Sequence, residues 1–123
     1  MKLFTDTHEW VEVIGSEAVV GITAHAIKEI GEIVFVQLPA IGSHVVLGQE
    51  ICVLESTKAA IDIYSPISGK VIAINTELHS QITKLNSQPE QAGWLFRLQI
   101  ANSEELSQLK DEGAYAKMLL VGF

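Results

Sequence analysis

Short apolar runs rich in valine and isoleucine recur along the chain, separated by glycine, proline, serine and asparagine. Runs of this length between turn-forming residues are typical of many short β-strands, not of a helical bundle. Residues 61–63 alternate as a half-buried strand does, whereas residues 51–54 are continuously apolar and predict a strand covered on both faces. The predicted strands are Glu9–Val13, Ala18–Ile22, Glu32–Gln37, His44–Val46, Ile51–Glu55, Ile61–Tyr64, Gly69–Ile74 and Trp94–Ile100.

One helix is predicted inside this β pattern, directly after the second strand. Thr23 is placed to cap a helix over Ala24–Ile30, and Gly31 is placed to end it in a left-handed conformation. The segment is short, so we expect it to lie at the periphery of the sheets.

A helical segment is also expected near the C-terminus, over about residues 102–120. Asn102 or Ser103 can cap its first turn, where two glutamates follow, and a second short helix is predicted after Gly113. The last five residues, 119–123, are apolar. We expect this tail to dock on the core; a partner surface is the alternative.

Composition narrows the range of functions. The 123 residues are 48% hydrophobic, which suits one compact domain over 1–123. The formal net charge is −7 and no Lys/Arg cluster is present, so nucleic-acid binding is not expected. The chain has one cysteine, no apolar leader and no run long enough to span a membrane. We expect a cytoplasmic monomer that does not bind membranes.

Residues that could carry out catalysis are sparse. The four histidines, His8, His25, His44 and His79, do not have the spacing of a metal site, so they are interpreted as surface or packing residues. Cys52 lies in an apolar strand and is expected to be a buried, inert thiol. The sequence therefore predicts no metal and no catalysis by the polypeptide itself.

Lys58 is the residue with the most informative surroundings. It lies in Glu55–Ala60 between two predicted strands, and Ser56 and Thr57 supply turn-forming side chains. A Gly-x-β-β-x-β pattern occurs on either side of it, at residues 31–36 and 69–74. The pattern places Lys58 at the tip of a tight hairpin, between small residues, where a prosthetic group could be attached.

Six sequence blocks occur in one order over about residues 4–118, and together they resemble the glycine cleavage system H-protein family. They are His8-Glu9-Trp10-Val11, Val20-Gly21-Ile22-Thr23, Gly31–Pro39, Glu55-Ser56-Thr57-Lys58-Ala59, Tyr64–Gly69 and Gly93-Trp94-Leu95.

This resemblance implies a mainly β, barrel-sandwich hybrid fold of the lipoyl/biotinyl type with short peripheral helices. It implies lipoate bound covalently to Lys58 through an amide. In this family the arm accepts an aminomethyl group from the glycine decarboxylase P protein and delivers it to the aminomethyltransferase T protein, and dihydrolipoamide dehydrogenase reoxidises it. A lipoate ligase or a lipoyl/octanoyl transferase attaches the group. The H protein itself is a non-catalytic carrier.

The resemblance also suggests roles for other residues. Glu55 and Gly69 match positions read by lipoyl-attaching enzymes, and each is interpreted as a recognition or hairpin-geometry residue. Glu9, Asp62 and Glu29 are hypothesised to contact the amine of the loaded arm. The simpler interpretation of each of these three acids is a solvated surface charge.

Departures from the family pattern keep alternative functions open. Thr57 stands where valine is common, and residues 77–83 and 90–92 differ from the usual sequence. These differences bear on docking to the P and T proteins more than on Lys58. The alternatives are a lipoyl donor or relay for 2-oxoacid dehydrogenases, a biotinyl carrier, and an interaction scaffold with unmodified Lys58. Biotinyl domains place methionines beside the lysine, where Thr57 and Ala59 stand here.

Overall fold

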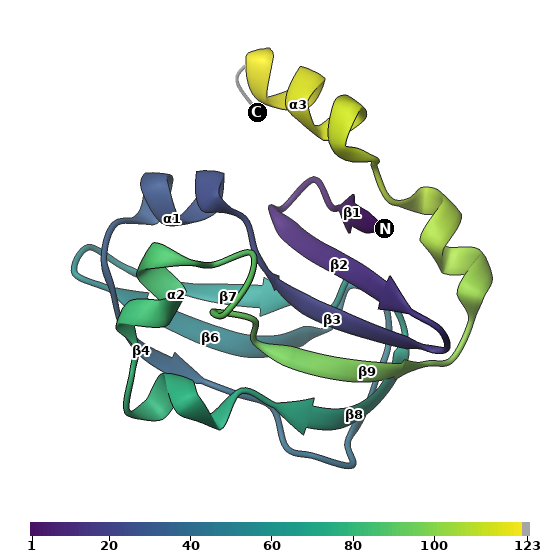
Figure 1. Cartoon of the computed structure of the whole chain (residues 1–123), viewed down its shortest axis with the longest axis horizontal. Helices are drawn as coiled ribbons and strands as arrows, with labels where there is room; N and C mark the ends of the chain where they lie inside the picture. Colours follow the sequence, from purple (N-terminus) through teal and green to yellow (C-terminus); the bar gives the residue numbers. More distant parts are fainter. Residues whose placement is uncertain (122–123) are drawn as a thin grey trace.

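The computed structural model describes residues 1–121 and consists of two antiparallel β-sheets with short helices around them (Figure 1). This confirms the mainly β fold class with peripheral helices; the sheets do not close into a barrel. The strands are β1 Lys2–Phe4, β2 Glu9–Ile14, β3 Glu17–Ile22, β4 Ile33–Gln37, β5 His44–Val45, β6 Glu50–Ser56, β7 Ala60–Tyr64, β8 Gly69–Ile74 and β9 Phe96–Ile100.

The larger sheet has six strands in the order β1-β2-β3-β9-β8-β5. Its edge strand β1 was missed from the sequence, because three residues are too few to show an alternating pattern. Phe4 of β1 pairs with Trp10 of β2 and exchanges backbone hydrogen bonds of 2.8 Å with Lys110. The N-terminus is thereby tied to the C-terminal part of the chain.

The smaller sheet has three strands in the order β4-β6-β7 and contains the hairpin that carries Lys58. The prediction that residues 51–54 are covered on both faces is wrong. Cys52 and Leu54 are buried, whereas Ile51 and Val53 are only partly buried, because they face away from the larger sheet. Apolar side chains on the outer face of β6 produced the continuous run.

The core lies between the two sheets and is formed by fully buried aliphatic residues and one phenylalanine. Val11, Leu54, Ile67, Phe96 and Leu98 have no exposed surface. A smaller cluster, formed by Phe4, Trp10, Val19 and Tyr115, lies outside the larger sheet. This second cluster attaches the C-terminal helix to the body.

The first helix, α1 Ala24–Ile30, has the predicted bounds. The Thr23 hydroxyl accepts a hydrogen bond from the Ala26 N–H, and Gly31 has a φ of +88°. Both predicted helix-end residues are confirmed.

Two further short helices were missed: η1 Thr76–His79, a 3₁₀ turn, and α2 Thr83–Ser87. Elements of four and five residues carry too little periodicity to be detected. They place Asn86 beside β4, where its side-chain oxygen accepts from the Ile33 N–H at 2.7 Å and its amide nitrogen donates to the Ile33 carbonyl at 2.9 Å.

The C-terminal region holds a 3₁₀ helix, η2 Ser103–Gln108, and an α-helix, α3 Glu112–Leu120. Asn102 caps the first and Asp111 caps the second, which starts one residue before Gly113 instead of after it. Leu119 packs on the smaller cluster, but Leu120 and Val121 are exposed, so the expectation of a docked tail holds only for Leu119. Residues 122–123 lie outside the described part. Within residues 1–121, no helix combines the length and apolarity needed to cross a membrane.

Candidate functional site

The hairpin between β6 and β7 presents Lys58 at its tip and is held by the side chain of Ser56. The Ser56 Oγ accepts hydrogen bonds of 3.1 Å from the N–H groups of both Lys58 and Ala59, and the Ser56 N–H donates to the Ala59 carbonyl at 2.8 Å. The Thr57 N–H donates to the Glu32 carbonyl at 3.0 Å, which ties the turn to the segment after α1. The turn is therefore fixed at its base and its side.

Lys58 is exposed, and its methylene chain passes Gly31. A Cβ placed on Gly31 would lie 3.5 Å from the Lys58 Cε, in ordinary contact. The positive φ of Gly31, not a steric clash, is what requires glycine at this position. Among the ion pairs of residues 1–121, none involves Lys58. Its ammonium group is therefore accessible, with exposed Ala59 and Ala60 beside it.

The two residues suggested for recognition lie in different environments. Glu55 is exposed on β6, paired with Ala60 next to the turn. Gly69 is buried in β8 of the other sheet, where a Cβ would come within 2.5 Å of the Gln99 carbonyl oxygen. The structure thus brings Glu55 to the hairpin and gives Gly69 a packing role between β8 and β9.

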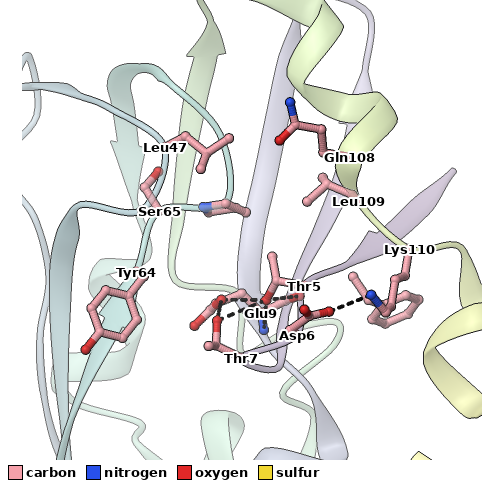
Figure 2. Close-up of a pocket in the computed structure, with 13 residues that line it drawn as sticks. Thr5, Asp6, Thr7, Glu9, Leu47, Tyr64, Ser65, Gln108, Leu109 and Lys110 are labelled. Carbon is pink, nitrogen blue, oxygen red and sulfur yellow. Dashed lines mark hydrogen bonds and ion pairs between the residues drawn. The ribbon is translucent and has the colours of Figure 1, made fainter. Parts of the chain in front are cut away.

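Glu9 is not a solvated acid, contrary to the simpler interpretation: only 2% of it is exposed. Its Oε1 accepts hydrogen bonds from the hydroxyls of Thr5, at 2.6 Å, and Thr7, at 2.5 Å (Figure 2). Burial raises the pKa of the Glu9 carboxyl, and the two hydroxyl hydrogen bonds partly offset this increase. A buried carboxyl held in this way is suited to bind a desolvated cation through a charge-assisted hydrogen bond.

A cavity of about 320 Å³ opens beside Glu9. Tyr64 and Ser65, at the end of β7, line one wall, and Leu109 and Lys110 line another (Figure 2). Lys110 forms an ion pair with Asp6 at 2.6 Å. The end of the hairpin strand thus contributes to the space in front of the buried acid.

A second cavity, of about 490 Å³, lies between α1, β7 and α3. Ala26 and Ile30 of α1, Ile61 of β7 and Leu119 of α3 supply apolar walls, and Glu29 is also among its lining residues. Thr7 lines this cavity and the one beside Glu9. Ile30 directly precedes Gly31, against which the outer methylene groups of Lys58 lie, so the cavity is close to the far end of the lysine side chain.

The other two candidate acids are exposed. Glu29 lies near His25, with 3.8 Å between its Oε1 and the histidine Nε2. Asp62 lines a separate groove with Gln37 and Glu50. The structure therefore places Glu9 and Glu29 at two cavities that share Thr7, and Asp62 lines neither of them.

Histidines that look scattered in the sequence meet in the structure. The rings of His8 and His25 lie 4.9 Å apart, and the His8 Nδ1 is 2.7 Å from the Tyr115 hydroxyl. That hydroxyl also lies 2.8 Å from the Oγ1 of Thr23, and Tyr115 stacks on Phe4. Burial and the neighbouring His25 lower the pKa of His8. This network was missed because its members are far apart in the sequence.

Other potentially reactive groups are inert or isolated. Cys52 is buried, as predicted, and burial raises the pKa of its thiol to about 12. Within the described residues, no cluster of three or more His, Cys, Asp or Glu side chains is placed to hold a metal ion. Lys58 and the cavities near it are the features that remain to be explained.

Comparison with known proteins decides the family. The model of the family described as Glycine cleavage H-protein matches residues 2–121. The chain belongs to this family. The glycine cleavage system H protein of Methylacidiphilum infernorum is 47% identical over 118 residues, which cover 96% of this chain and 92% of that protein. The H protein of Thermotoga maritima is 44% identical over 115 residues, which cover 94% and 93%.

A solved structure supports the same family assignment. The crystal structure of a glycine cleavage system H protein from Mycobacterium marinum superposes with a TM-score of 0.87 at 31% identity, covering 96% of this chain and 95% of that one. As a member of the H-protein family, the chain has the lipoyl-carrying shuttle role in the glycine cleavage system. It is a non-catalytic carrier component of that system, which interacts with further components such as the P and T proteins.

Proposed function

We propose that Lys58 is the lipoyl attachment residue of this carrier. The observation that supports this most is an accessible ammonium group on a hairpin tip fixed by Ser56 and by the contact between Thr57 and Glu32. In the attachment step the deprotonated Lys58 Nζ attacks an activated lipoyl or octanoyl carbonyl. The amide C–N bond forms, the bond to the activating group breaks, and a proton leaves the nitrogen.

The site fits such a group on both sides of the lysine. The small neighbours Ala59 and Ala60 leave room for an attaching enzyme, and the cavity bounded by Ile30, Ile61 and Leu119 offers apolar walls to a long arm. When bound, lipoate supplies a disulfide that accepts an aminomethyl group and releases it to the next enzyme. The protein contributes a rigid base and a sheltered place for the arm.

We propose that Glu9 holds the amine of the loaded arm. Its buried carboxyl faces the cavity that the end of β7 lines, and Thr5 and Thr7 fix the position of one of its oxygens. A cationic amine there would favour the ionised carboxyl and form a charge-assisted hydrogen bond. Glu29 lines the second cavity, which shares Thr7 with the first, and is proposed as a weaker contact. For Asp62 the proposal rests on sequence resemblance alone, because it lines neither cavity.

We further propose which enzymes act on the arm and in which compartment the protein works. The arm is reoxidised by dihydrolipoamide dehydrogenase after delivering its one-carbon unit to the T protein, and a lipoate ligase or a lipoyl/octanoyl transferase modifies Lys58. The protein works in the cytoplasm. The single buried cysteine is in keeping with a reducing compartment.

Intact mass tests the attachment. The purified protein is incubated with a lipoate ligase, lipoate and ATP, and its mass is measured before and after. We expect one lipoyl group on the unmodified chain and none on Lys58→Arg, whereas Lys70→Arg, an exposed lysine on β8, should be modified normally. Modification of Lys58→Arg, or no modification of the unaltered protein, would overturn the assignment.

The role of Glu9 is tested on the loaded carrier. The lipoylated protein is charged with glycine by the P protein and then separated, and the survival of the adduct is followed by mass. Glu9→Gln should shorten the lifetime by about tenfold, the effect of losing roughly one charge-assisted hydrogen bond. Glu12→Gln is the control, because Glu12 lies on the same strand, is partly exposed and pairs with the N-terminal ammonium group instead of facing the cavity. Equal lifetimes for the two variants would refute the role.

A further inference from the structure

The outer face of the three-stranded sheet has an unusual surface for a sheet next to solvent. We define the outer sheet face by Phe35, Gln37, Val53, Glu55 and Asp62. The strand register places Phe35 opposite Glu55, and Val53 opposite Gln37 and Asp62. Phe35 is 52% exposed, and Val53 is partly exposed beside it.

The charges on this face have one sign. The strands β4, β6 and β7 contain Glu50, Glu55 and Asp62 and no lysine or arginine. The face thus combines an exposed aromatic side chain with the carboxylates of Glu55 and Asp62, and Lys58 lies in the turn between β6 and β7. A partner that fits it presents basic side chains around an apolar contact.

The position of Lys58 limits what that partner is. A protein that modifies the Lys58 Nζ must enclose the hairpin tip. The few residues of the tip offer far less surface than the roughly 800 Å² that each partner buries in a standard interface. Contact must therefore continue along one side of the hairpin. The side toward α1 holds the Thr57–Glu32 hydrogen bond, the lysine methylenes and the apolar cavity. The outer sheet face is the side that remains open.

We propose that the outer sheet face is the docking surface for the enzyme that acylates Lys58, with Phe35 as its apolar centre. The proposal rests on Lys58 being the attachment residue. The enzyme binds the face with basic residues and places its activated acyl group at the hairpin tip, and the arm formed there remains free to fold toward the α1 side. Val34, also 52% exposed, extends the apolar contact into a groove of about 330 Å³ that Leu78 and Ile82 line.

Steady-state acylation by a lipoate ligase, with lipoate and ATP, tests this. Phe35→Gln should lower kcat/KM about tenfold, mainly by raising KM, which is the usual effect of removing one interface hot spot. Ile14→Gln is the matched control, because Ile14 is 57% exposed on the larger sheet, and it should stay within about twofold of the unaltered protein. The rate for the unaltered protein should also fall as salt is added.

Further measurements separate docking from folding and from other partners. Each variant is checked by circular dichroism and thermal unfolding. Val34→Thr, which keeps the β-branched shape and strand propensity, should lower kcat/KM about threefold without loss of structure. Acylation of Phe35→Gln at the rate of Ile14→Gln would overturn the proposal. So would normal acylation combined with a defect only in the reaction with the P protein, which would assign the face to that partner. No lipoyl mass on the unaltered protein would overturn the Lys58 assignment as well.

Discussion

Removing the Tyr115 hydroxyl should loosen the C-terminal helix from the body. Tyr115 is the one buried residue among those described in α3, and its hydroxyl lies 2.7 Å from the His8 Nδ1 and 2.8 Å from the Thr23 Oγ1. Tyr115→Phe keeps the ring and its stack on Phe4, so the change removes the two polar contacts and little packing.

The expected cost follows from the burial of the two partners. Water can replace the hydroxyl at partly buried His8, so that bond contributes about 0.5–1 kcal/mol. Thr23 is 1% exposed, and in the variant its hydroxyl keeps the hydrogen bond from the Ala26 N–H but loses the tyrosine hydroxyl. Leaving this buried group without its second partner costs about 1–2 kcal/mol. The free energy of unfolding should fall by about 2 kcal/mol in total, and for a chain of this size the Tm should fall by about 8 °C.

Tyr64→Phe provides the matched control. It removes the same atom from a tyrosine that is 37% exposed, and within residues 1–121 its hydroxyl makes no hydrogen bond. Urea unfolding followed by tryptophan fluorescence gives the free energy for both variants, and thermal unfolding gives the Tm. A Tyr115→Phe protein that is as stable as Tyr64→Phe would show that the hydroxyl network does not hold α3.

Four further substitutions have expected effects on stability. Burial raises the pKa of Glu9 above 4.5, so the native state binds this proton more tightly than the unfolded chain and the protein loses stability as pH rises. Glu9→Gln should therefore raise the urea midpoint of unfolding near neutral pH, and this gain should shrink as pH falls to 4.5. The pKa of His8 is lowered below 6.5, so acidification through pH 6.5 protonates the unfolded chain first and destabilises the native protein. His8→Asn keeps a residue type that tolerates the φ of 71° and should make the free energy of unfolding less dependent on pH in this range. Gly69→Ala should cost about 1–3 kcal/mol through the clash with the Gln99 carbonyl, whereas Gly113→Ala, with only an ordinary contact, should be neutral or stabilising by up to about 1 kcal/mol in α3. Equal thermal stability of the two glycine variants would contradict the steric account.

The hairpin and Lys58 could be predicted from the sequence because both depend on local features. A short apolar strand on either side, with Ser56 and Thr57 at the turn, is enough to place the lysine at a tip. The cap at Thr23 and the stop at Gly31 are equally local, and both were found. The family resemblance then supplied the attached group, which no spacing of residues alone specifies.

The surroundings of the arm could not be predicted because they depend on contacts between distant segments. Glu9 is buried only because the Thr5–Thr7 turn folds over it and the end of β7 forms the opposite wall. His8 and Tyr115 are 107 residues apart, and no periodic pattern links them. Tyr115 is the single aromatic residue of α3, and this was the available signal that it anchors the helix.

Asn86 also determines how the small sheet ends. Its side-chain amide offers the Ile33 backbone one acceptor and one donor, as a neighbouring strand would. Asn86 belongs to a helix, however, so the pairing does not continue as a strand. An exposed edge strand can recruit a strand from another molecule and start aggregation. At Ile33 the backbone groups needed for such a contact are already occupied, so a single asparagine from a five-residue helix prevents intermolecular strand pairing at the first residue of this edge strand.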